Sequence, residues 1–367
     1  MSAHLHLGVA LDGAGRHPAA WREPDARPAE QFTARYWTDL VREAEAGTLD
    51  FVTFEDALGP PERLDAVLVA ARVAPATHGI GLIPTVTVTH TEPFHVSKAI
   101  ATLDYVSEGR AGVRVRVSAR PEEARHVGRR TPGDAGELLA EAADYVEVLR
   151  RLWDSWEDDA EIRDAATGRF VDRDKLHYID FSGRWFSVRG PSITPRPPQG
   201  QPLVAALAHR ADPYRLVGTS ADLGFVTPRD AAHARAIVGE ICAARDDARR
   251  EEGVHVLADL LVYLDDDAGA AAARRARLDA RAGTPYESDA AAFTGTPAQL
   301  ADLLLEWRDA GLSGFRLRPA ALPHDLRQIT RGLVPELRRR GAFRTRYEAA
   351  TLRGLFGLPR PANRYAA

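Results

Sequence analysis

The chain of 367 residues has little cysteine, lysine and asparagine. Its one cysteine, Cys242, cannot form an internal disulfide, so a reducing compartment such as the cytoplasm is expected. Lysine occurs at Lys98 and Lys175 alone and asparagine at Asn363 alone. Arginine therefore carries nearly all of the positive charge, and the sequence offers no internal asparagine as a ligand.

Long apolar runs and a strong net charge are also missing. No stretch of about 18 apolar residues occurs, so no membrane span is expected. Residues 1–11 lack the basic and apolar parts of a signal peptide and are expected to form a first strand. The formal net charge is -4, which makes nucleic acid an unexpected partner.

Several motifs that would point to other chemistry do not occur. The sequence contains no GxGxxG after a strand and no GxxxxGK[ST], which speaks against a dinucleotide-binding fold and a P-loop. It also contains no HExxH, CxxC or GxSxG. The usual zinc-protease, thiol-redox and serine-hydrolase signatures are therefore excluded.

The chain does contain short apolar runs, rich in Val, Ile and Leu, that alternate with helical segments. This pattern is typical of a parallel sheet covered by helices. Eight such runs predict an α/β fold of the (β/α)8 TIM-barrel type, in a single domain over residues 1–367. The expected strands are Leu5–Leu11, Phe51–Phe54, Ile80–Val88, Ala111–Val117, Pro202–Leu207, Leu223–Val226, Val254–Leu264 and Gly314–Arg318.

Helix start and stop signals support this organisation. Helices are expected over Thr33–Ala46 with Gly47 as C-cap, over Pro93–Val106, over Ala231–Glu252, and over Pro297–Ala310 with Thr296 as N-cap.

Three segments interrupt the barrel pattern. Residues 158–200 contain a hairpin signal with its turn at Ser182–Gly183 and are expected to be an insertion over the barrel mouth. A second insertion is expected at Arg120–Gly136. Residues 341–367 lie beyond the last barrel helix and are expected to wrap the outside of the barrel or a partner subunit.

Stretches spread over most of the chain resemble the nitrilotriacetate monooxygenase branch of the luciferase-like superfamily, which includes EDTA monooxygenase and dibenzothiophene-sulfone monooxygenase. The most specific is at the C-terminus, where Val334-Pro335-Glu336-Leu337 is followed by Phe343-Arg344-Thr345, Tyr347 and Leu358-Pro359-Arg360-Pro361. Other matching stretches are Gly15–Arg22, Ile80–Lys98, Leu103–Gly112, Leu152–Trp156 and Phe186–Pro202.

This resemblance implies a chemistry. Such enzymes take reduced FMN from a separate flavin reductase and use O2 to oxygenate a small organic substrate, while the protein positions the cofactor and excludes water. The resemblance to this family also implies a homodimer or a larger homo-oligomer.

The sequence departs from the family pattern where the flavin is expected. Arg114 stands at the position of a flavin-contacting asparagine, and Leu138-Leu139 at that of an Arg-Tyr pair. Ala208-His209-Arg210 stands where the family has a Gly-Ser-Ser phosphate loop. Arg114 and Arg116 share one face of their strand. These arginines either bind a phosphate or carboxylate, or pair with buried acids as structure.

Other candidate residues follow the strands. Thr85 and Glu55-Asp56 keep family positions at two strand ends, and His17, Trp21 and Arg22 follow the first strand. The resulting hypothesis assigns proton handling to His17, Glu55 and Asp56, and cofactor binding to Thr85, Arg114, His209 and Arg210. It assigns substrate binding to Trp21, Arg22, Arg116 and His177, although a structural role is the more expected one for His177 in its hairpin.

Three alternatives remain open at this stage. The cofactor could be the deazaflavin F420, whose acidic tail suits added arginines. The chain could also be a flavin-free binding protein or a non-catalytic subunit. Finally, His4 and His6 share one face of the first strand and could form a metal pair. They stand at the wrong end of that strand for a barrel active site, so no metal is predicted.

Overall fold

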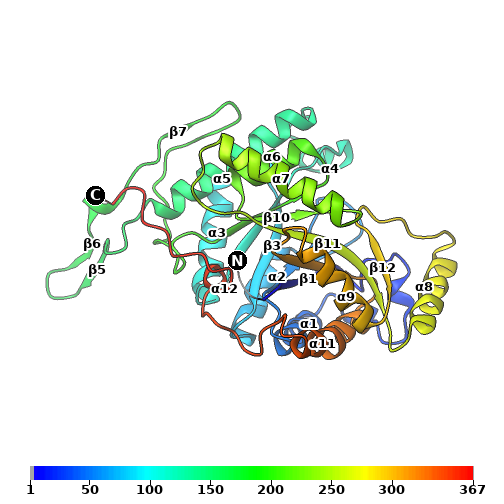
Figure 1. The fold of residues 1–367 in the computed structure, drawn as a ribbon. Coiled ribbons are helices and arrows are strands. Elements are labelled where there is room, and N and C mark those ends of the chain that lie inside the picture. Colours follow the sequence, from blue (N-terminus) through cyan, green and yellow to red (C-terminus); the bar gives the residue numbers. More distant parts are fainter. Residues whose placement is uncertain (1–3, 367) are drawn as a thin grey trace.

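In the computed structural model, which describes residues 4–366, eight parallel strands close into a barrel surrounded by helices (Figure 1). The ring closes because β10 pairs with both β9 and β11, and β1 pairs with both β2 and β13. All eight expected strands are confirmed. They are β1 (His6–Leu11), β2 (Phe51–Phe54), β3 (Gly81–Thr87), β4 (Gly112–Arg116), β9 (Leu203–Ala208), β10 (Leu223–Val226), β11 (His255–Leu264) and β13 (Gly314–Pro319).

One strand was not expected. β12 (Ala292–Gly295) pairs with β11 outside the ring. Its four residues include no run of β-branched side chains, so the sequence pattern carried no strand signal there.

The helices pack around the barrel and begin largely where their caps predict. Thr33 accepts from the Tyr36 amide at the start of α1, and Thr296 and Gln299 form a capping box at α9. The helices are α1 (Ala34–Ala46), α2 (Ala66–Val73), α3 (Pro93–Val106), α4 (Pro121–Val127), α5 (Ala135–Asp154), α6 (Ala211–Ser220), α7 (Ala231–Asp247), α8 (Ala268–Ala282), α9 (Pro297–Arg308), α10 (His324–Gln328), α11 (Val334–Arg339) and α12 (Leu352–Leu355).

Two helix ends differ from the expectation. α7 ends at Asp247, and not at Glu252, and α9 ends at Arg308, and not at Ala310. The end of α1 at Ala46 with Gly47 as C-cap is confirmed. Gly47 has φ -76, and the next residue, Thr48 with φ 55, takes the left-handed conformation.

The C-terminal segment closes one end of the barrel. Leu352, Leu355 and Phe356 pack into an apolar cluster with Phe51 and Phe225 from the barrel interior. The ring centroids of Phe51 and Phe356 lie 6.0 Å apart. The expected wrapping around the outside is therefore wrong for this part of the segment, because its apolar side chains enter the N-terminal opening of the barrel.

The expected insertion at residues 158–200 forms an arm that projects from the barrel (Figure 1). It contains β5 (Glu161–Asp164), β6 (Arg169–Val171) and the hairpin of β7 (Phe181–Ser182) and β8 (Ser187–Val188). The hairpin is confirmed, but its expected place over the barrel mouth is wrong. The arm joins the end of α5 to the start of β9, and such connections leave from the N-terminal end of a barrel.

The last residues of the chain run along the base of this arm. The Asn363 side-chain amide donates to the carbonyl oxygens of Asp154 and Trp156, and Tyr365 stacks on His177 with ring centroids 5.2 Å apart. The single asparagine of the sequence thus fastens the chain end to the arm.

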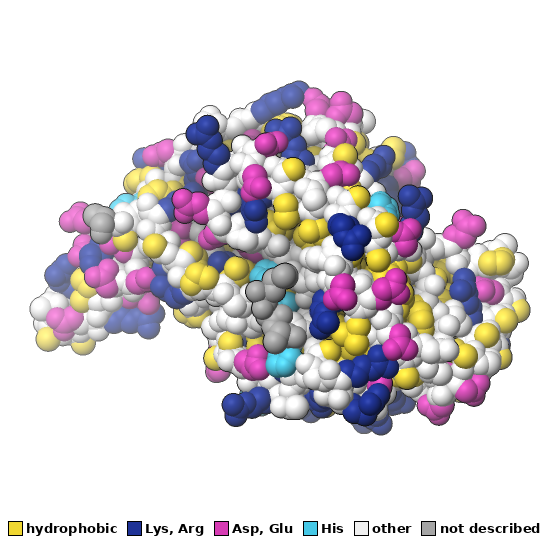
Figure 2. Space-filling model, viewed as in Figure 1, with side chains coloured by type: hydrophobic (Ala, Val, Ile, Leu, Met, Phe, Trp, Pro, Cys, Tyr) yellow, Lys and Arg dark blue, Asp and Glu magenta, His cyan; other side chains and the backbone are white. Residues whose placement is uncertain are grey.

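The surface is mixed in character. On the face shown in Figure 2, basic and acidic side chains are interspersed, in line with the formal net charge of -4. Within residues 4–366, no helix combines the length and the apolar character needed to cross a membrane.

Candidate active site

A cavity of about 1260 Å³ opens at the C-terminal end of the barrel strands. Its walls come from the segments that follow β1, β2, β4 and β9, and from residues 286–289. Ligand pockets usually measure about 300–1,000 Å³, so this cavity has room for more than one small molecule. It lies where barrel enzymes place their active sites.

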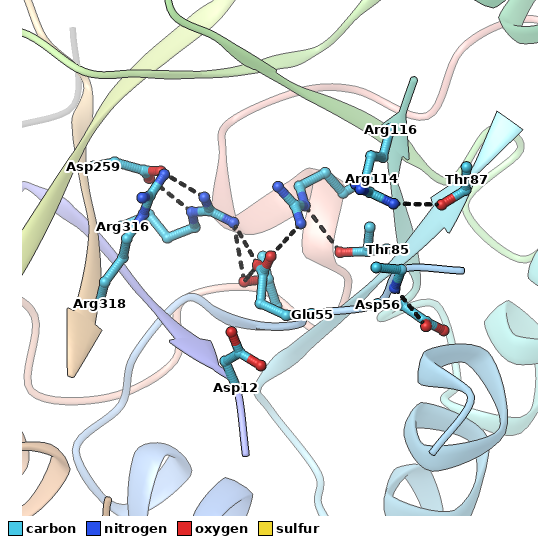
Figure 3. A network of polar contacts seen from close by, with 12 residues as sticks. Asp12, Glu55, Asp56, Thr85, Thr87, Arg114, Arg116, Asp259, Arg316 and Arg318 are labelled. Atoms are coloured by element: carbon cyan, nitrogen blue, oxygen red, sulfur yellow. Dashed lines mark hydrogen bonds and ion pairs between the residues drawn. The ribbon is translucent and has the colours of Figure 1, made fainter. Parts of the chain in front are cut away.

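The floor of the cavity is built from ionic side chains (Figure 3). Glu55, at the end of β2, forms ion pairs with Arg114 of β4 and with Arg316 of β13. Arg114 also donates to the Thr85 hydroxyl at 2.9 Å. Arg114 and Arg316 are both nearly inaccessible to solvent, so these pairs are held in a low-dielectric interior.

A second carboxylate lies deeper in the barrel. Asp259 of β11 accepts two hydrogen bonds from Arg316, at 2.7 and 2.5 Å, and also pairs with Arg318. Arg316 packs over the ring of Phe225, with its guanidinium carbon 4.3 Å from the ring centroid. Each arginine of this buried group has a carboxylate partner, and Asp289 at the rim supplies a second one to Arg318, as low-dielectric burial requires.

The protonation state of Glu55 follows from these neighbours. Burial alone raises the pKa of Glu55, but Arg114 and Arg316 outweigh it and bring the pKa down to about 2. Burial lowers the pKa of Arg114 to about 10, against the opposing effect of Glu55. At neutral pH both groups stay charged, so Glu55, expected to handle protons, is held as a carboxylate.

Arg116 points inward like Arg114, as the strand alternation predicts. It donates to the Thr87 hydroxyl at 3.0 Å and pairs with Glu123 of α4. The expected pairing with acids is therefore confirmed, and the binding of a phosphate or carboxylate by these cavity-facing arginines stays a prediction. Leu138 and Leu139 line the same side of the cavity.

An ion-pair chain crosses the rim. Asp12, after β1, accepts from Arg16 at 3.0 Å and from Arg63 at 3.3 Å. Asp289 pairs with Arg318 and lies 3.9 Å from Arg16. The chain ties the segments after β1 and β2 to residues 286–289.

His209 and Arg210 follow β9 and lead into α6. His209 contacts the Thr227 hydroxyl at 3.0 Å and Asp289 at 3.3 Å, and burial lowers its pKa. Arg210 is exposed, lines the cavity and has no polar side-chain partner among the described residues. The first turn of α6 has no side-chain cap. The Arg210 guanidinium group and the uncapped first turn of α6 therefore meet at this wall, where Pro213 offers no amide and Asp212 adds an exposed carboxylate.

His17 lies beneath the cavity wall with both ring nitrogens engaged. The Ala19 amide donates to Nδ1 at 3.1 Å, so the ring proton is on Nε2, which donates to Asp279 at 3.1 Å. His17 is buried and connects the segment after β1 to α8. These contacts hold the loop in place.

The remaining expected residues are only partly brought together. Asp56 lines the cavity, but its carboxylate accepts from the amides of Ala57 and Ala66, and burial raises its pKa. Trp21 lines the rim. Arg22 stacks on the Trp21 ring and donates to a backbone oxygen of α8.

His177 is not brought to the cavity. It lies in the arm, where it bonds Glu157 at 2.8 Å and stacks on Tyr365. The sequence placed it near the mouth because the whole insertion was expected there. Its contacts in the structure are those of a residue that packs the chain end.

The two histidines of the first strand have other partners as well. His6 bonds the buried carboxylate of Asp50 at 2.7 Å, at the end of the barrel opposite the cavity. Across residues 4–366, no three or more His, Cys, Asp or Glu side chains come together as a group that could hold a metal ion.

Sequence reasoning missed three of the five ionic residues of the floor. Arg316, Arg318 and Asp259 were not singled out, although they carry a signal. Residues 314–319 read Gly-Phe-Arg-Leu-Arg-Pro, with the same alternating arginines as Val113–Val117, and Asp259 interrupts an otherwise apolar strand. Charged residues on one face of a buried strand indicate an interior ionic layer.

Comparisons with known proteins agree with this fold. Residues 17–290 match the family model of the luciferase-like monooxygenases. The chain is 30% identical to N-acetyl-S-(2-succino)cysteine monooxygenase of Bacillus subtilis (strain 168), over 99% of this chain and 98% of that protein. It is 29% identical to nitrilotriacetate monooxygenase component A of Aminobacter aminovorans, with the same coverage.

Solved structures show the same architecture. The structure of EDTA monooxygenase from Chelativorans sp. BNC1 superposes with a TM-score of 0.86 at 24% identity, covering 97% of this chain and 99% of that one. A long-chain alkane monooxygenase superposes with a TM-score of 0.89 at 23% identity, covering 97% of this chain and 96% of that one.

Proposed function

The chain belongs to the luciferase-like monooxygenase family, and we propose that it is a reduced-flavin-dependent monooxygenase that oxygenates a small organic substrate with O2. The full-length similarity to two monooxygenases at about 30% identity supports this activity. The cavity at the C-terminal end of the barrel is the proposed site of reaction.

The residues present fit the phosphate of FMN. The N-terminus of α6 opens on the cavity, and helix N-termini attract anions through free amides and the helix dipole. Arg210 adds a guanidinium group that no acid neutralises. This free arginine at a helix N-terminus inside the family cavity is the observation that carries the proposal. His209 borders the same place.

The flavin ring has a suitable wall and floor. Val117, Leu138, Leu139 and Leu207 give an apolar side of the cavity. Arg114, held on the floor by Glu55 and Thr85, brings a fixed positive charge close to this wall. Charges close to a flavin ring tune its electronic properties, and here the charge is held by two partners.

Bound reduced flavin supplies the electrons with which O2 is activated. The protein contributes positioning and shelter from water. The buried ionic floor is rigid because each member has a partner, and Glu55 stays ionised at neutral pH. We assign Glu55 to fixing Arg114 electrostatically.

Two finer expectations belong to this proposal. Reduced FMN is expected to come from a separate flavin reductase, since a relative carries the name component A. The enzyme is expected to act in the cytoplasm as a homodimer or a larger homo-oligomer.

The test is a titration of the purified protein with FMN, with reduced FMN under anaerobic conditions, and with F420. Micromolar binding of reduced FMN is expected, and Arg210→Ala is expected to weaken it about tenfold or more, because a charge-assisted contact is lost. Arg229→Ala, an exposed arginine after β10 that does not line the cavity, is the matched control.

Two results would contradict the proposal. Binding of F420 alone would move the function to a deazaflavin oxidoreductase. If the protein bound none of the three, it would not be a flavin-dependent enzyme.

A further inference from the structure

The cavity has two unlike halves. The cofactor half is the wall formed by β4, β9 and the first turns of α5 and α6, to which the flavin is assigned above. The substrate half is formed by the segments after β1 and β2 and by residues 286–289. The two halves adjoin, since only β3 separates β2 from β4 in the ring and Asp289 contacts His209 at 3.3 Å, but their other side chains differ in character.

In the substrate half, every described cation that lines the cavity is already paired. Arg16 and Arg63 both donate to Asp12, at 3.0 and 3.3 Å. Glu62 and Glu287 stand on the exposed rim, and neither has a cationic partner among the described residues. A carboxylate entering this half would therefore meet acids without counter-ions and no free guanidinium group.

The wall of the substrate half is aromatic. Trp37 and Phe54 lie side by side, with ring centroids 6.2 Å apart. The indole nitrogen of Trp37 donates to the Gln31 carbonyl oxygen, and both rings are buried, with Trp37 8% and Phe54 1% exposed. At the rim, Trp21 is 50% exposed and Phe32 is 60% exposed. Large aromatic side chains exposed together in a cavity mark a surface that a ligand covers.

The cofactor half has the opposite character. Arg210 has no acidic partner among the described residues, and Arg116 and Arg120 share a single acid, Glu123, at 3.0 and 3.8 Å. Asp212, in the first turn of α6, is an exposed acid of this half without a cationic partner among the described residues, so three arginines face two acids here. A small excess of cations and an aromatic rim are thus separated within one cavity. The separation assigns anionic groups to the cofactor half and uncharged groups to the substrate half.

We propose that the substrate is a neutral, largely apolar, ring-containing molecule without a carboxylate, which binds against the exposed rings of Trp21 and Phe32. This inference rests on the proposed function, because it leaves the other half of the cavity to the flavin. It separates this chain from the relative named for nitrilotriacetate, an anion with several carboxylates.

The experiment compares two probes by calorimetry on the full chain. Dibenzothiophene sulfone is the neutral ring probe, and nitrilotriacetate is the anionic probe. The sulfone is expected to bind at least about tenfold more tightly, which corresponds to roughly 1.4 kcal/mol. Trp21→Ala is expected to weaken sulfone binding about fivefold or more, because an exposed aromatic contact is lost. Tyr178→Ala, a 55% exposed aromatic on the arm, should change nothing.

A charge variant provides an independent readout. The double variant Glu62→Lys and Glu287→Lys is expected to raise nitrilotriacetate binding several-fold without changing sulfone binding, since both positions are on the exposed rim. Nitrilotriacetate binding in the unmodified protein as tight as that of the sulfone, or a Trp21→Ala variant with unchanged sulfone affinity, would overturn the inference.

A parallel titration with reduced FMN separates this inference from the proposed function. FMN binding without sulfone binding overturns the substrate class alone. Sulfone binding without FMN binding keeps the substrate class and overturns the flavin enzyme.

Discussion

The two ends of the barrel interior are filled by different kinds of side chain. At the N-terminal end, apolar side chains from five strands meet Leu352, Leu355 and Phe356 of the C-terminal segment. At the C-terminal end, three buried arginines pair with Glu55, Asp259 and Asp289 beneath the cavity. The N-terminal end is thus filled mainly by apolar side chains, with the buried His6–Asp50 pair beside them, and the C-terminal end by ion pairs.

The difference shows how each end is stabilised. Apolar packing is non-directional, so a distant piece of chain can fill the N-terminal end once it reaches the opening. Ionic groups in a low-dielectric interior must match in number and geometry, because an unmatched charge costs several kcal/mol. The ion pairs give the protein a fixed electrostatic surface under the cavity, and the apolar packing at the other end stabilises the fold.

The largest expected loss of stability comes from removing a buried carboxylate at the ionic end. Asp259→Ala leaves Arg316 and Arg318 without their shared carboxylate and is expected to lower the free energy of unfolding by about 5 kcal/mol. Urea denaturation of the flavin-free protein measures this loss. Asp246→Ala, which removes an exposed pair with Arg245, should have little effect. A loss below about 1 kcal/mol for Asp259→Ala would mean that the floor is open to water.

Creating a cavity at the apolar end is expected to lower the free energy of unfolding somewhat less than Asp259→Ala does. Phe356 is 3% exposed, and Phe356→Ala is expected to lower the free energy of unfolding by about 3–4 kcal/mol. Affinity for reduced FMN should stay unchanged, because the variant lies at the other end of the barrel. The control is Phe170→Ala, since Phe170 is 63% exposed on the arm. If the folded Phe356→Ala variant bound reduced FMN more weakly, packing at the apolar end would be coupled to binding in the cavity.

Low pH is expected to lower the free energy of unfolding through the apolar end and not through Glu55, by less than either of the two substitutions above. Burial, together with His6, lowers the pKa of His255 to about 4 at the apolar end. The unfolded chain then binds more protons than the folded one, so stability falls as the pH drops from about 6.5 towards 4. Glu55 keeps its charge over this range, because its pKa is about 2.

The measurement for this effect is urea denaturation at pH 7 and pH 4.5. The loss of stability between the two pH values is expected to be about 2 kcal/mol smaller in His255→Gln than in the unmodified protein. Equal losses in the two proteins would assign the acid sensitivity to other groups.

Much of the fold could be predicted from local pattern. The eight strands follow from short runs of apolar side chains between helical segments, and the starts of α1 and α9 follow from Thr33 and Thr296. The position of the cavity also follows, since barrel sites lie at the C-terminal ends of strands. β12 was not predicted, because a short strand beside a complete sheet needs no alternation of apolar residues.

The candidate site was predicted less completely. Alternation placed Arg114 and Arg116 on an inward face, but the partner of each arginine lies far along the chain or on a separate helix. Arg210 was expected to be one of several cationic phosphate ligands, and the fold leaves it as the unpaired one. His177 was expected at the mouth, and the direction in which the arm leaves the barrel decided otherwise.

The sequence by itself determined the barrel, its family resemblance and the presence of arginines on inward faces, because periodicity and composition are local properties. The tertiary structure decided which charges neutralise one another, which guanidinium group stays free, and which wall of the cavity is aromatic. These outcomes depend on contacts between residues up to about 260 positions apart, such as Glu55 with Arg316, and no local pattern encodes such a distance. Burial then fixes the result, since in a low-dielectric interior each charge must find its partner or shift its pKa.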